Sequence, residues 1–272
     1  MWPVPVPVGT DSSYVLPAGS LPSLQPHNVL IEEFSGQACS NCPGGHTTLD
    51  GIEASHPGRV NIVTMYFKGQ PQAIPPSGAI YDFRNDTAYS ITQLIYSDLA
   101  GLPSSGVDRI GSSRTFLGAS SWAGPITSQL TPPVPDSINL GISSSYNTLT
   151  GIATITDTVT YLYNVYGHQN VSIYVVEDSL IDKQEFPTTI NPAYLFMDVF
   201  QAMVNSAPMG NPVLDSMVSK PQGQVYWRKY TFNPSTTRIV NPRHCRVVAF
   251  INNQGTGGDY RVLQSVQCKL VP

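Results

Sequence analysis

Two hydrophobic periodicities divide the chain near residue 131. In the first part, the apolar runs 28–34 and 60–67 predict two buried strands, because each run is continuous rather than alternating. Residues 43–56 between them predict a helix with Pro43 in its first turn, where the missing proline N–H is not needed. A strand, a helix and a strand in this order predict a βαβ unit with a right-handed crossover. The pattern continues with a weakly helical segment at 79–100, a strand near 106–110 and a helix within 112–130.

After residue 136 the hydrophobic period changes to two. The alternating runs predict antiparallel strands at 138–142, 151–156, 158–163, 171–176, 225–232, 246–252 and 260–269. Residues 193–204 are compatible with either a helix or a strand, because their bulky run Tyr194-Leu195-Phe196-Met197 fits both. Short strands separated by turn residues predict an antiparallel β-sandwich of the Ig-like or jelly-roll type.

These patterns predict four consecutive segments. They are a Pro-rich extended arm at 1–27, an α/β domain at 28–130, a Pro-rich linker at 131–136 and a β-sandwich domain at 137–272. The alternation of Pro and Val at 2–8 favours polyproline or edge-strand geometry. Such an arm either packs along its own domain or adds as a strand to the exposed sheet edge of a neighbouring molecule.

Composition excludes several functional classes. The formal charge of −4, with only 12% charged residues, argues against a nucleic-acid partner, because no surplus of Lys and Arg can neutralise phosphates. Hydrophobic residues make up 41% of the chain, which is enough for a core and argues against disorder. No apolar run approaches the ~18 residues of a membrane-spanning helix. The many Pro, Gly and Tyr residues indicate a turn-rich β protein of the secreted or surface class.

The N-terminus carries no recognisable secretion signal. Residues 1–8 have neither a basic region nor an apolar core, so the protein is either cytosolic or numbered after a removed signal. The low charge and the abundance of Ser, Thr and Asn favour removal, and therefore an extracytoplasmic location.

Two of the four cysteines fall on the last predicted hairpin. If its loop 254–259 is centred between residues 256 and 257, Cys245 lies opposite Cys268. Directly opposed residues approach closely enough for a bridge, so we expect a Cys245–Cys268 disulfide, which would indicate an oxidising compartment. The alternative is a pair of buried thiols.

The remaining pair, Cys39-Ser40-Asn41-Cys42, is the one motif that carries chemistry. Two thiols at this spacing can form a small disulfide, supply half of a zinc site, or bind a soft metal with His46. A second cysteine pair suitable for zinc is missing and no other histidine is near, so we expect neither a metal nor another cofactor. The pair stands where a buried strand meets a helix, and a helix N-terminus stabilises a thiolate.

This position predicts a division of roles for redox chemistry. Cys39 would be the nucleophile, and the more buried Cys42 would be the resolving thiol. Glu33, six residues earlier on the strand, would point towards the underside of the pair and exchange a proton with Cys42. The alternative is that Glu33 is an exposed acid at the end of the strand.

The order Glu33-Phe34, Cys39-x-x-Cys42-Pro43, helix and apolar strand resembles the thioredoxin fold. In that superfamily a cis-proline faces the two cysteines, and this resemblance assigns the role to Pro103 in Gly101-Leu102-Pro103-Ser104. The chain departs from active thioredoxins at Ala38, where an aromatic residue is common, and at Ser40-Asn41, which replace Gly-Pro.

The longer stretch 29–46 resembles the twenty-eight-kilodalton outer-membrane protein family of Bacteroidetes. Weaker similarities are found at 81–84, 103–109, 247–250 and 262–266. The resemblance implies a thioredoxin-like domain followed by a β-sandwich, and export to the cell envelope, often with a lipid anchor. The cysteine that carries such an anchor is absent here.

The same resemblance implies O-glycosylation, because Bacteroidetes modify exported proteins at Asp-Ser/Thr followed by a small or aliphatic residue. Five sites match this pattern, and their modified side chains would be Thr87, Ser137, Thr158, Ser179 and Ser216.

The sequence leaves open whether the protein is an enzyme. It favours an exported cell-surface protein with a structural or binding role, with protein partners or self-assembly and a static Cys39–Cys42 disulfide. The alternative is an extracytoplasmic thiol-disulfide oxidoreductase whose redox partner is not evident. An enzyme needs Cys39 accessible in a groove beside Pro103, whereas a structural protein can cover it.

Overall fold

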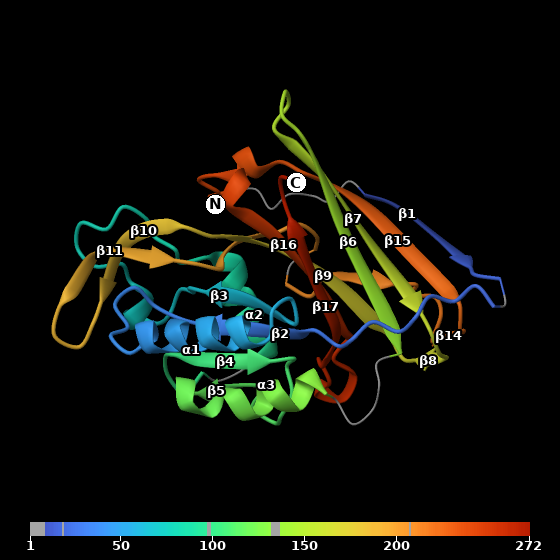
Figure 1. The fold of residues 1–272 in the computed structure, drawn as a ribbon, viewed down its shortest axis with the longest axis horizontal. Coiled ribbons are helices and arrows are strands. Elements are labelled where there is room, and N and C mark those ends of the chain that lie inside the picture. Colours follow the sequence, from blue (N-terminus) through green and yellow to red (C-terminus); the bar gives the residue numbers. More distant parts are fainter. Residues whose placement is uncertain (1–8, 18, 97–98, 132–136, 207) are drawn as a thin grey trace.

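A thioredoxin-like unit stands beside a β-sandwich, which confirms the predicted fold class (Figure 1). The structure is a computed structural model. It describes residues 9–17, 19–96, 99–131, 137–206 and 208–272.

The thioredoxin-like unit contains the predicted βαβ element. It consists of β2 (Val29–Phe34), α1 (Cys42–Ser55), β3 (Val60–Met65), α2 (Asp86–Ile95), β4 (Ser104–Val107), β5 (Phe116–Leu117) and α3 (Ala123–Leu130). Its strands lie in the order β3-β2-β4-β5, with β2 and β3 parallel and β4 antiparallel to β2. Side chains of α1 and α3 share one core cluster with this sheet and those of α2 share another, so the helices cover both faces (Figure 1).

Local sequence explains these elements. All six residues of β2 and all six of β3 are buried, as expected for central parallel strands covered on both faces. The helix α2 begins after Asn85, whose side-chain oxygen accepts hydrogen bonds from the N–H groups of Thr87 and Ala88. The predicted helical segment 79–100 is therefore reduced to the part that follows this cap.

The sandwich packs a four-stranded sheet against part of a longer sheet, which also contains the strands of the thioredoxin-like unit. The four strands are, in order, β1 (Gly9–Val15), β15 (Gln224–Phe232), β7 (Ile152–Tyr161) and β6 (Ile138–Asn147). The opposing strands are β9 (Gln169–Glu177), β12 (Val199–Met203), β13 (Asn211–Val213), β16 (Cys245–Asn253) and β17 (Val262–Lys269). The strands predicted at 151–156 and 158–163 form the single strand β7.

Shorter elements complete the fold. They are the two-stranded hairpin β10 (Leu180–Glu185) and β11 (Ile190–Phe196), the pair β8 (Val165–Tyr166) and β14 (Ser219–Lys220), and the 3₁₀ turns Pro71–Ala73, Ala119–Ser121, Pro234–Thr236, Pro242–His244 and Thr256–Gly258. The ambiguous segment 193–204 therefore contains strand residues of β11 and β12 and no helix.

One nine-stranded sheet runs through both halves of the molecule. Its order is β17-β16-β9-β12-β3-β2-β4-β5, with β13 attached to β9, and β12 joins β3 through the pair Val199 and Thr64. Leu30 and Phe34 of the thioredoxin-like unit share a core cluster with Tyr174 and Phe250 of the sandwich. The two halves are thus joined by both backbone pairing and side-chain packing.

The predicted Pro-rich arm is partly visible. Its residues 9–15 form β1, which pairs with β15 at the edge of the four-stranded sheet. Residues 1–8, to which the strand-addition hypothesis applies, lie outside the described residues, as do residues 132–136 of the predicted linker.

The predicted Cys245–Cys268 disulfide is wrong, because both cysteines are free thiols. Val247, not Cys245, lies opposite Cys268, and a register shift at Ile251/Asn252 leaves an extra residue, Leu263, on β17. An asymmetric turn and this bulge displace the pairing by two positions. Burial in the sandwich core raises the pKa of both thiols, that of Cys268 to about 11.

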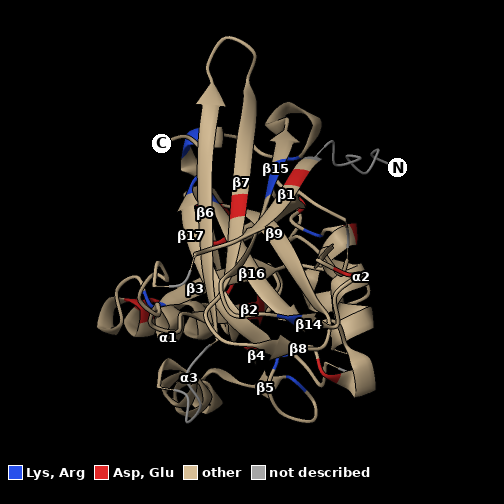
Figure 2. Ribbon diagram, turned by 90° about the vertical axis from the view of Figure 1, so that its right-hand side faces the viewer, with Lys and Arg blue, Asp and Glu red and all other residues tan. Residues whose placement is uncertain are grey.

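Charged residues are sparse and scattered over the ribbon (Figure 2). Among the described residues, no helix has the length and apolar character needed to cross a membrane.

Candidate functional site

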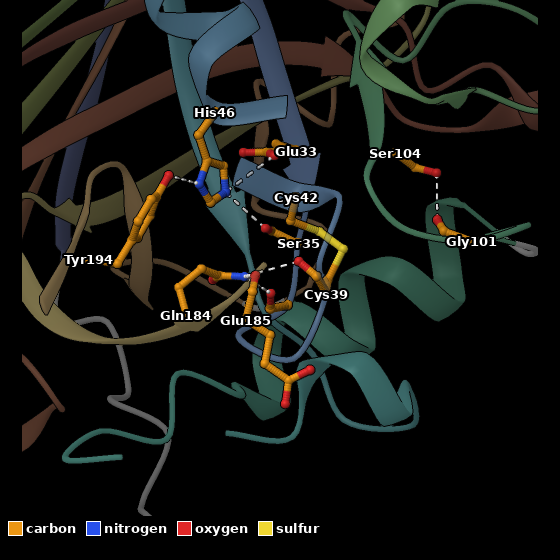
Figure 3. The surroundings of a disulfide bond; sticks show 11 residues. Glu33, Ser35, Cys39, Cys42, His46, Gly101, Ser104, Gln184, Glu185 and Tyr194 are labelled. Atoms are coloured by element: carbon orange, nitrogen blue, oxygen red, sulfur yellow. Dashed lines mark hydrogen bonds and ion pairs between the residues drawn. A yellow bond between two sulfur atoms is a disulfide. The ribbon is translucent and has the colours of Figure 1, made fainter. Parts of the chain in front are cut away.

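The two cysteines of the CxxC motif lie at the junction of β2 and α1. Cys39 stands in the turn that precedes the helix, and Cys42 is the first helical residue, after the N-cap Asn41. The predicted Cys39–Cys42 disulfide is confirmed, with an S–S distance of 2.05 Å (Figure 3). Cys39 is 4% exposed and Cys42 is fully buried. The pair therefore has the position expected of a thioredoxin-like motif, but very little of it reaches the surface.

Glu33 and Pro103 both lie close to Gly45 in the first turn of α1. The Leu102–Pro103 peptide bond is cis, as the resemblance implied, and it directly precedes β4. A Cβ atom placed on Gly45 would lie 3.1 Å from Glu33 Oε1, 3.3 Å from Pro103 Cβ and 2.9 Å from the ring of Trp122. Gly45 thus lets the helix approach both residues closely, which brings the four predicted site residues into one region.

Glu33 is a buried acid and not an exposed one. Its side chain is fully enclosed, and Oε2 accepts a hydrogen bond of 3.0 Å from Thr64 Oγ1. Burial raises the pKa of Glu33 to about 8, with a smaller upward contribution from the charge of Asp198. Oε1 has no hydrogen-bond partner within the described part of the chain. At pH 7 the carboxyl group is therefore predominantly protonated.

His46 connects Glu33 to the other half of the molecule. Its Nε2 lies 2.9 Å from Ser35 Oγ and 3.5 Å from Glu33 Oε1, and its Nδ1 lies 2.8 Å from Tyr194 Oη (Figure 3). Burial lowers the pKa of His46 to about 4. Both His46 and Glu33 are thus uncharged at neutral pH, and the contact is a polar contact rather than an ion pair.

The hairpin β10–β11 packs against the segment that carries Cys39. Gln184 Nε2 donates hydrogen bonds to the carbonyl oxygens of Cys39, at 3.0 Å, and Gly36, at 3.2 Å (Figure 3). The N–H of Glu185 donates to the carbonyl oxygen of Gln37 at 2.8 Å. An aromatic and aliphatic cluster holds the base of the hairpin: Tyr66, Phe83, Leu180, Phe196 and Val199. Residues about 145 positions away in sequence thus pack against the motif.

Sequence reasoning missed this packing. The only signal was the bulky run Tyr194-Leu195-Phe196-Met197, which did not indicate where its side chains would pack. In the structure Tyr194 contacts His46, with ring centroids 5.7 Å apart, and Phe196 belongs to the supporting cluster.

The atoms that a metal at this motif would use are already engaged. The two sulfur atoms are bonded to each other, and both nitrogens of His46 have polar neighbours. In the ranges that the structure describes, no group of three or more His, Cys, Asp and Glu side chains could hold a metal ion.

The glycosylation candidates differ in accessibility. Ser179 and Ser216 are exposed, whereas Thr87, Ser137 and Thr158 are half-buried. Ser179 has a positive φ of 62° in the turn between β9 and β10.

Comparison with known proteins identifies a related family. The profile of the family described as "Outer membrane protein Omp28" matches residues 92–271. No curated protein matches the sequence.

Several solved structures are similar to this chain at low sequence identity. HBP35 of Porphyromonas gingivalis is similar with a TM-score of 0.66 and 15% identity, over 91% of this chain and 76% of that chain. A protein of Agrobacterium tumefaciens is similar with a TM-score of 0.53 and 10% identity, over 91% of this chain and 96% of that chain. A domain of the outer membrane lipoprotein Omp28 from Porphyromonas gingivalis is 19% identical, with a TM-score of 0.32, over 52% of this chain and 95% of that domain.

Proposed function

Because the chain belongs to the family of outer membrane protein Omp28, we propose that it serves at the cell surface as a structural or binding protein. The family membership agrees with the resemblance read from the sequence, and it makes the protein extracytoplasmic. In this proposal the Cys39–Cys42 disulfide is a permanent part of the fold.

The observation that carries the proposal is the enclosure of Cys39. A thiol-disulfide exchange reaction requires in-line approach of an external sulfur atom to one sulfur of the pair. Here Cys39 is 4% exposed, and Gln184 holds its carbonyl oxygen from the hairpin. A partner protein could react with Cys39 only after the segments packed around it had moved. Such enclosure suits a disulfide that is formed once and then kept.

We expect the Cys39–Cys42 pair to remain oxidised in redox buffers that reduce thiol catalysts. Structural disulfides generally have potentials below about −300 mV, whereas thioredoxin is near −270 mV. The measurement is equilibration in glutathione and dithiothreitol buffers, acid quenching, and alkylation under denaturing conditions with detection by mass spectrometry. Cys245 and Cys268, which are free thiols, provide the internal standard for complete alkylation.

A pair of variants tests whether the hairpin is responsible for the low reduction potential of the disulfide. Gln184→Ala removes the amide that holds Cys39, and we expect it to raise the potential and speed reduction. Gln93→Ala, on the exposed side of α2, should leave both unchanged. A wild-type potential above about −270 mV would contradict a structural role and support exchange activity.

The second candidate is an extracytoplasmic oxidoreductase, and Glu33 is the observation that favours it. A buried acid with a pKa of about 8 can exchange protons near neutral pH. In this mechanism the Cys39 thiolate attacks a substrate disulfide and releases one substrate thiolate, which forms a mixed disulfide. Cys42 then transfers its proton to the ionised fraction of Glu33, attacks the sulfur of Cys39 and releases the second substrate thiolate. The result is a reduced substrate and an oxidised Cys39–Cys42 pair, which a separate thiol reductant must regenerate.

The proposal for an exported protein also includes O-glycosylation. We expect sugar on Ser216 and Ser179, whose side chains are exposed, before the half-buried Thr158. Glycopeptide mass spectrometry of protein purified from its native host tests this order. Detection of all five candidate sites without sugar would remove modification from the proposal.

A further inference from the structure

A pocket of about 450 Å³ lies far from the CxxC motif in the fold, between the loop that follows β4 and the turn that joins β16 to β17. Its lining residues are Arg109, Ile110, Gly111, Arg114, Gly257, Gly258, Asp259, Tyr260 and Arg261. None of them belongs to the disulfide site or to the hairpin that packs against it.

The lining is unusually basic for this protein. Three arginines and one aspartate surround the pocket, although the whole chain has only 14 Lys and Arg residues and a net charge of −4. Glu32 neutralises Arg109 through two hydrogen bonds of 2.8 Å. In the described ranges, neither Arg114 nor Arg261 forms an ion pair with a carboxylate. The pocket therefore offers positive charge that the described side chains leave unneutralised.

Arg114 is held in place without losing its charge. Its guanidinium donates to the carbonyl oxygens of Ile95, at 2.8 Å, and of Gly258, and it lies 5.0 Å from the centre of the Tyr260 ring. Carbonyl and ring contacts orient the group but do not neutralise it. An arginine that is already ordered loses little conformational entropy when it binds an anion.

The turn keeps the pocket open. Gly257 and Gly258 have positive φ values of 66° and 85°, a conformation that favours glycine, and a Cβ on Gly258 would lie 3.2 Å from Arg114 Nη2. Asp259, the only acid in the lining, accepts hydrogen bonds from Asn253 Nδ2 and the N–H of Arg261. Its carboxylate is held in the turn and its charge offsets one of the two arginines that lack an ion pair, so the lining keeps a net positive charge.

We propose that this pocket binds a small organic anion through its carboxylate or phosphate group, with Arg114 and Arg261 as the binding residues. The planar guanidinium matches the geometry of both oxyanions. The volume lies within the range of small-molecule sites and exceeds what a single inorganic ion would fill. The glycines, which have no side chain, leave space beside the Tyr260 ring for the organic part of the anion.

Isothermal titration calorimetry at low ionic strength tests the proposal on the intact protein. The probes are citrate, which carries only carboxylates, and glucose 6-phosphate, which carries one phosphate, with glucose as the uncharged comparison. We expect at least one anionic probe to bind and glucose not to bind. Arg261→Gln should weaken that binding about tenfold or more, because a charge-assisted contact is lost.

Two further variants distinguish binding in the pocket from general electrostatic attraction of anions to the protein. Arg114→Gln should also weaken binding, and its thermal unfolding curve reports whether the turn is intact. Arg243→Gln changes the net charge equally at an exposed position outside the pocket and should leave the affinity unchanged. The proposal is overturned if neither anion binds, or if Arg243→Gln weakens binding as much as Arg261→Gln. Either outcome is independent of the redox state of Cys39 and Cys42.

Discussion

Glu32→Ala is expected to destabilise the protein by about 3–5 kcal/mol, because it leaves a buried guanidinium without its counter-ion. Glu32 and Arg109 are each 1% exposed in their side chains, and two hydrogen bonds of 2.8 Å join them. The hydroxyls of Tyr96 and Tyr174 also donate to Glu32. Equilibrium urea unfolding, followed by tryptophan fluorescence, measures the loss.

The double variant distinguishes an unpaired charge from a simple loss of packing. Glu32→Leu combined with Arg109→Met removes both charges and keeps similar volume, so it should recover most of the stability lost in either single variant. A loss of less than about 1 kcal/mol in Glu32→Ala would contradict the burial of the pair. A double variant as unstable as the sum of the two single variants would contradict their coupling.

This ion pair also explains why we expect one unfolding transition for the two halves. Glu32 belongs to β2, whereas Tyr174 and Phe250, which contact Arg109, belong to β9 and β16. The pair therefore sits where the thioredoxin-like unit and the sandwich meet. If one half unfolded alone, the buried charges of Glu32 and Arg109 would lose part of the surroundings that stabilise them. This cost favours cooperative unfolding of both halves.

The part of the fold near the CxxC motif could be predicted because the sequence features that determine it lie close together in the chain. Continuous apolar runs at 28–34 and 60–67 indicate buried strands, and Pro43 marks the first turn of the helix between them. The position of Pro103 followed from resemblance rather than from periodicity. These features depend on neighbours within a few residues, or on a motif that the superfamily shares.

The packing of β10–β11 against the motif and the register of the last hairpin could not be predicted for the opposite reason. Gln184 reaches Cys39 across 145 positions, and hydrophobic periodicity carries no information about such a contact. The register of β16 and β17 depends on a bulge at Leu263, which a count of loop residues cannot reveal. In the sequence, nothing distinguishes Glu32 from an ordinary acid in a strand. Only the fold brings Arg109 and the hydroxyls of two tyrosines to it.

The predicted role of Glu33 now has a firmer physical basis than its sequence position gave it. The sequence left open an exposed acid at the strand end, and the structure shows an enclosed one whose pKa is raised to about 8. A raised pKa is typical of catalytic acids, but enclosure alone produces it as well. Stability measurements can therefore establish the ionisation of Glu33 without assuming catalysis.

Glu33→Gln is expected to remove a pH dependence of stability between about pH 4.5 and 8. In this range the folded wild type keeps a proton that the unfolded chain releases, so stability falls as pH rises through the folded pKa. The slope is about 1.36 kcal/mol per pH unit, which gives about 5 kcal/mol over the whole range as an upper limit. Glutamine resembles the protonated carboxyl group, so the variant should be near wild-type stability at pH 5 and clearly more stable at pH 9.

His46 provides the matched comparison because its effect on the pH dependence of stability has the opposite sign. Burial lowers its pKa to about 4, so as pH falls below 6.5 the unfolded chain gains a proton that the folded protein does not. Wild-type stability therefore loses a contribution from His46 as pH falls towards 4, and His46→Gln should remove that loss without altering the decline above pH 6.5.

Urea unfolding of wild type, Glu33→Gln and His46→Gln at half-unit steps from pH 4 to 9 separates the two groups. The free energies of unfolding of wild type and Glu33→Gln should diverge steadily up to about pH 8 and then run parallel. Asp157, whose pKa is raised to about 7, is present in all three proteins, so its contribution cancels in the differences. Asp198 has a similarly raised pKa and its charge raises the pKa of Glu33, so the difference between wild type and Glu33→Gln includes the repulsion between these two acids. Parallel curves for wild type and Glu33→Gln over the whole range would mean that Glu33 is ionised when folded. With an ordinary pKa its carboxylate would be too weak a base to take a proton from Cys42 near neutral pH, and the oxidoreductase candidate would lose the observation that favours it.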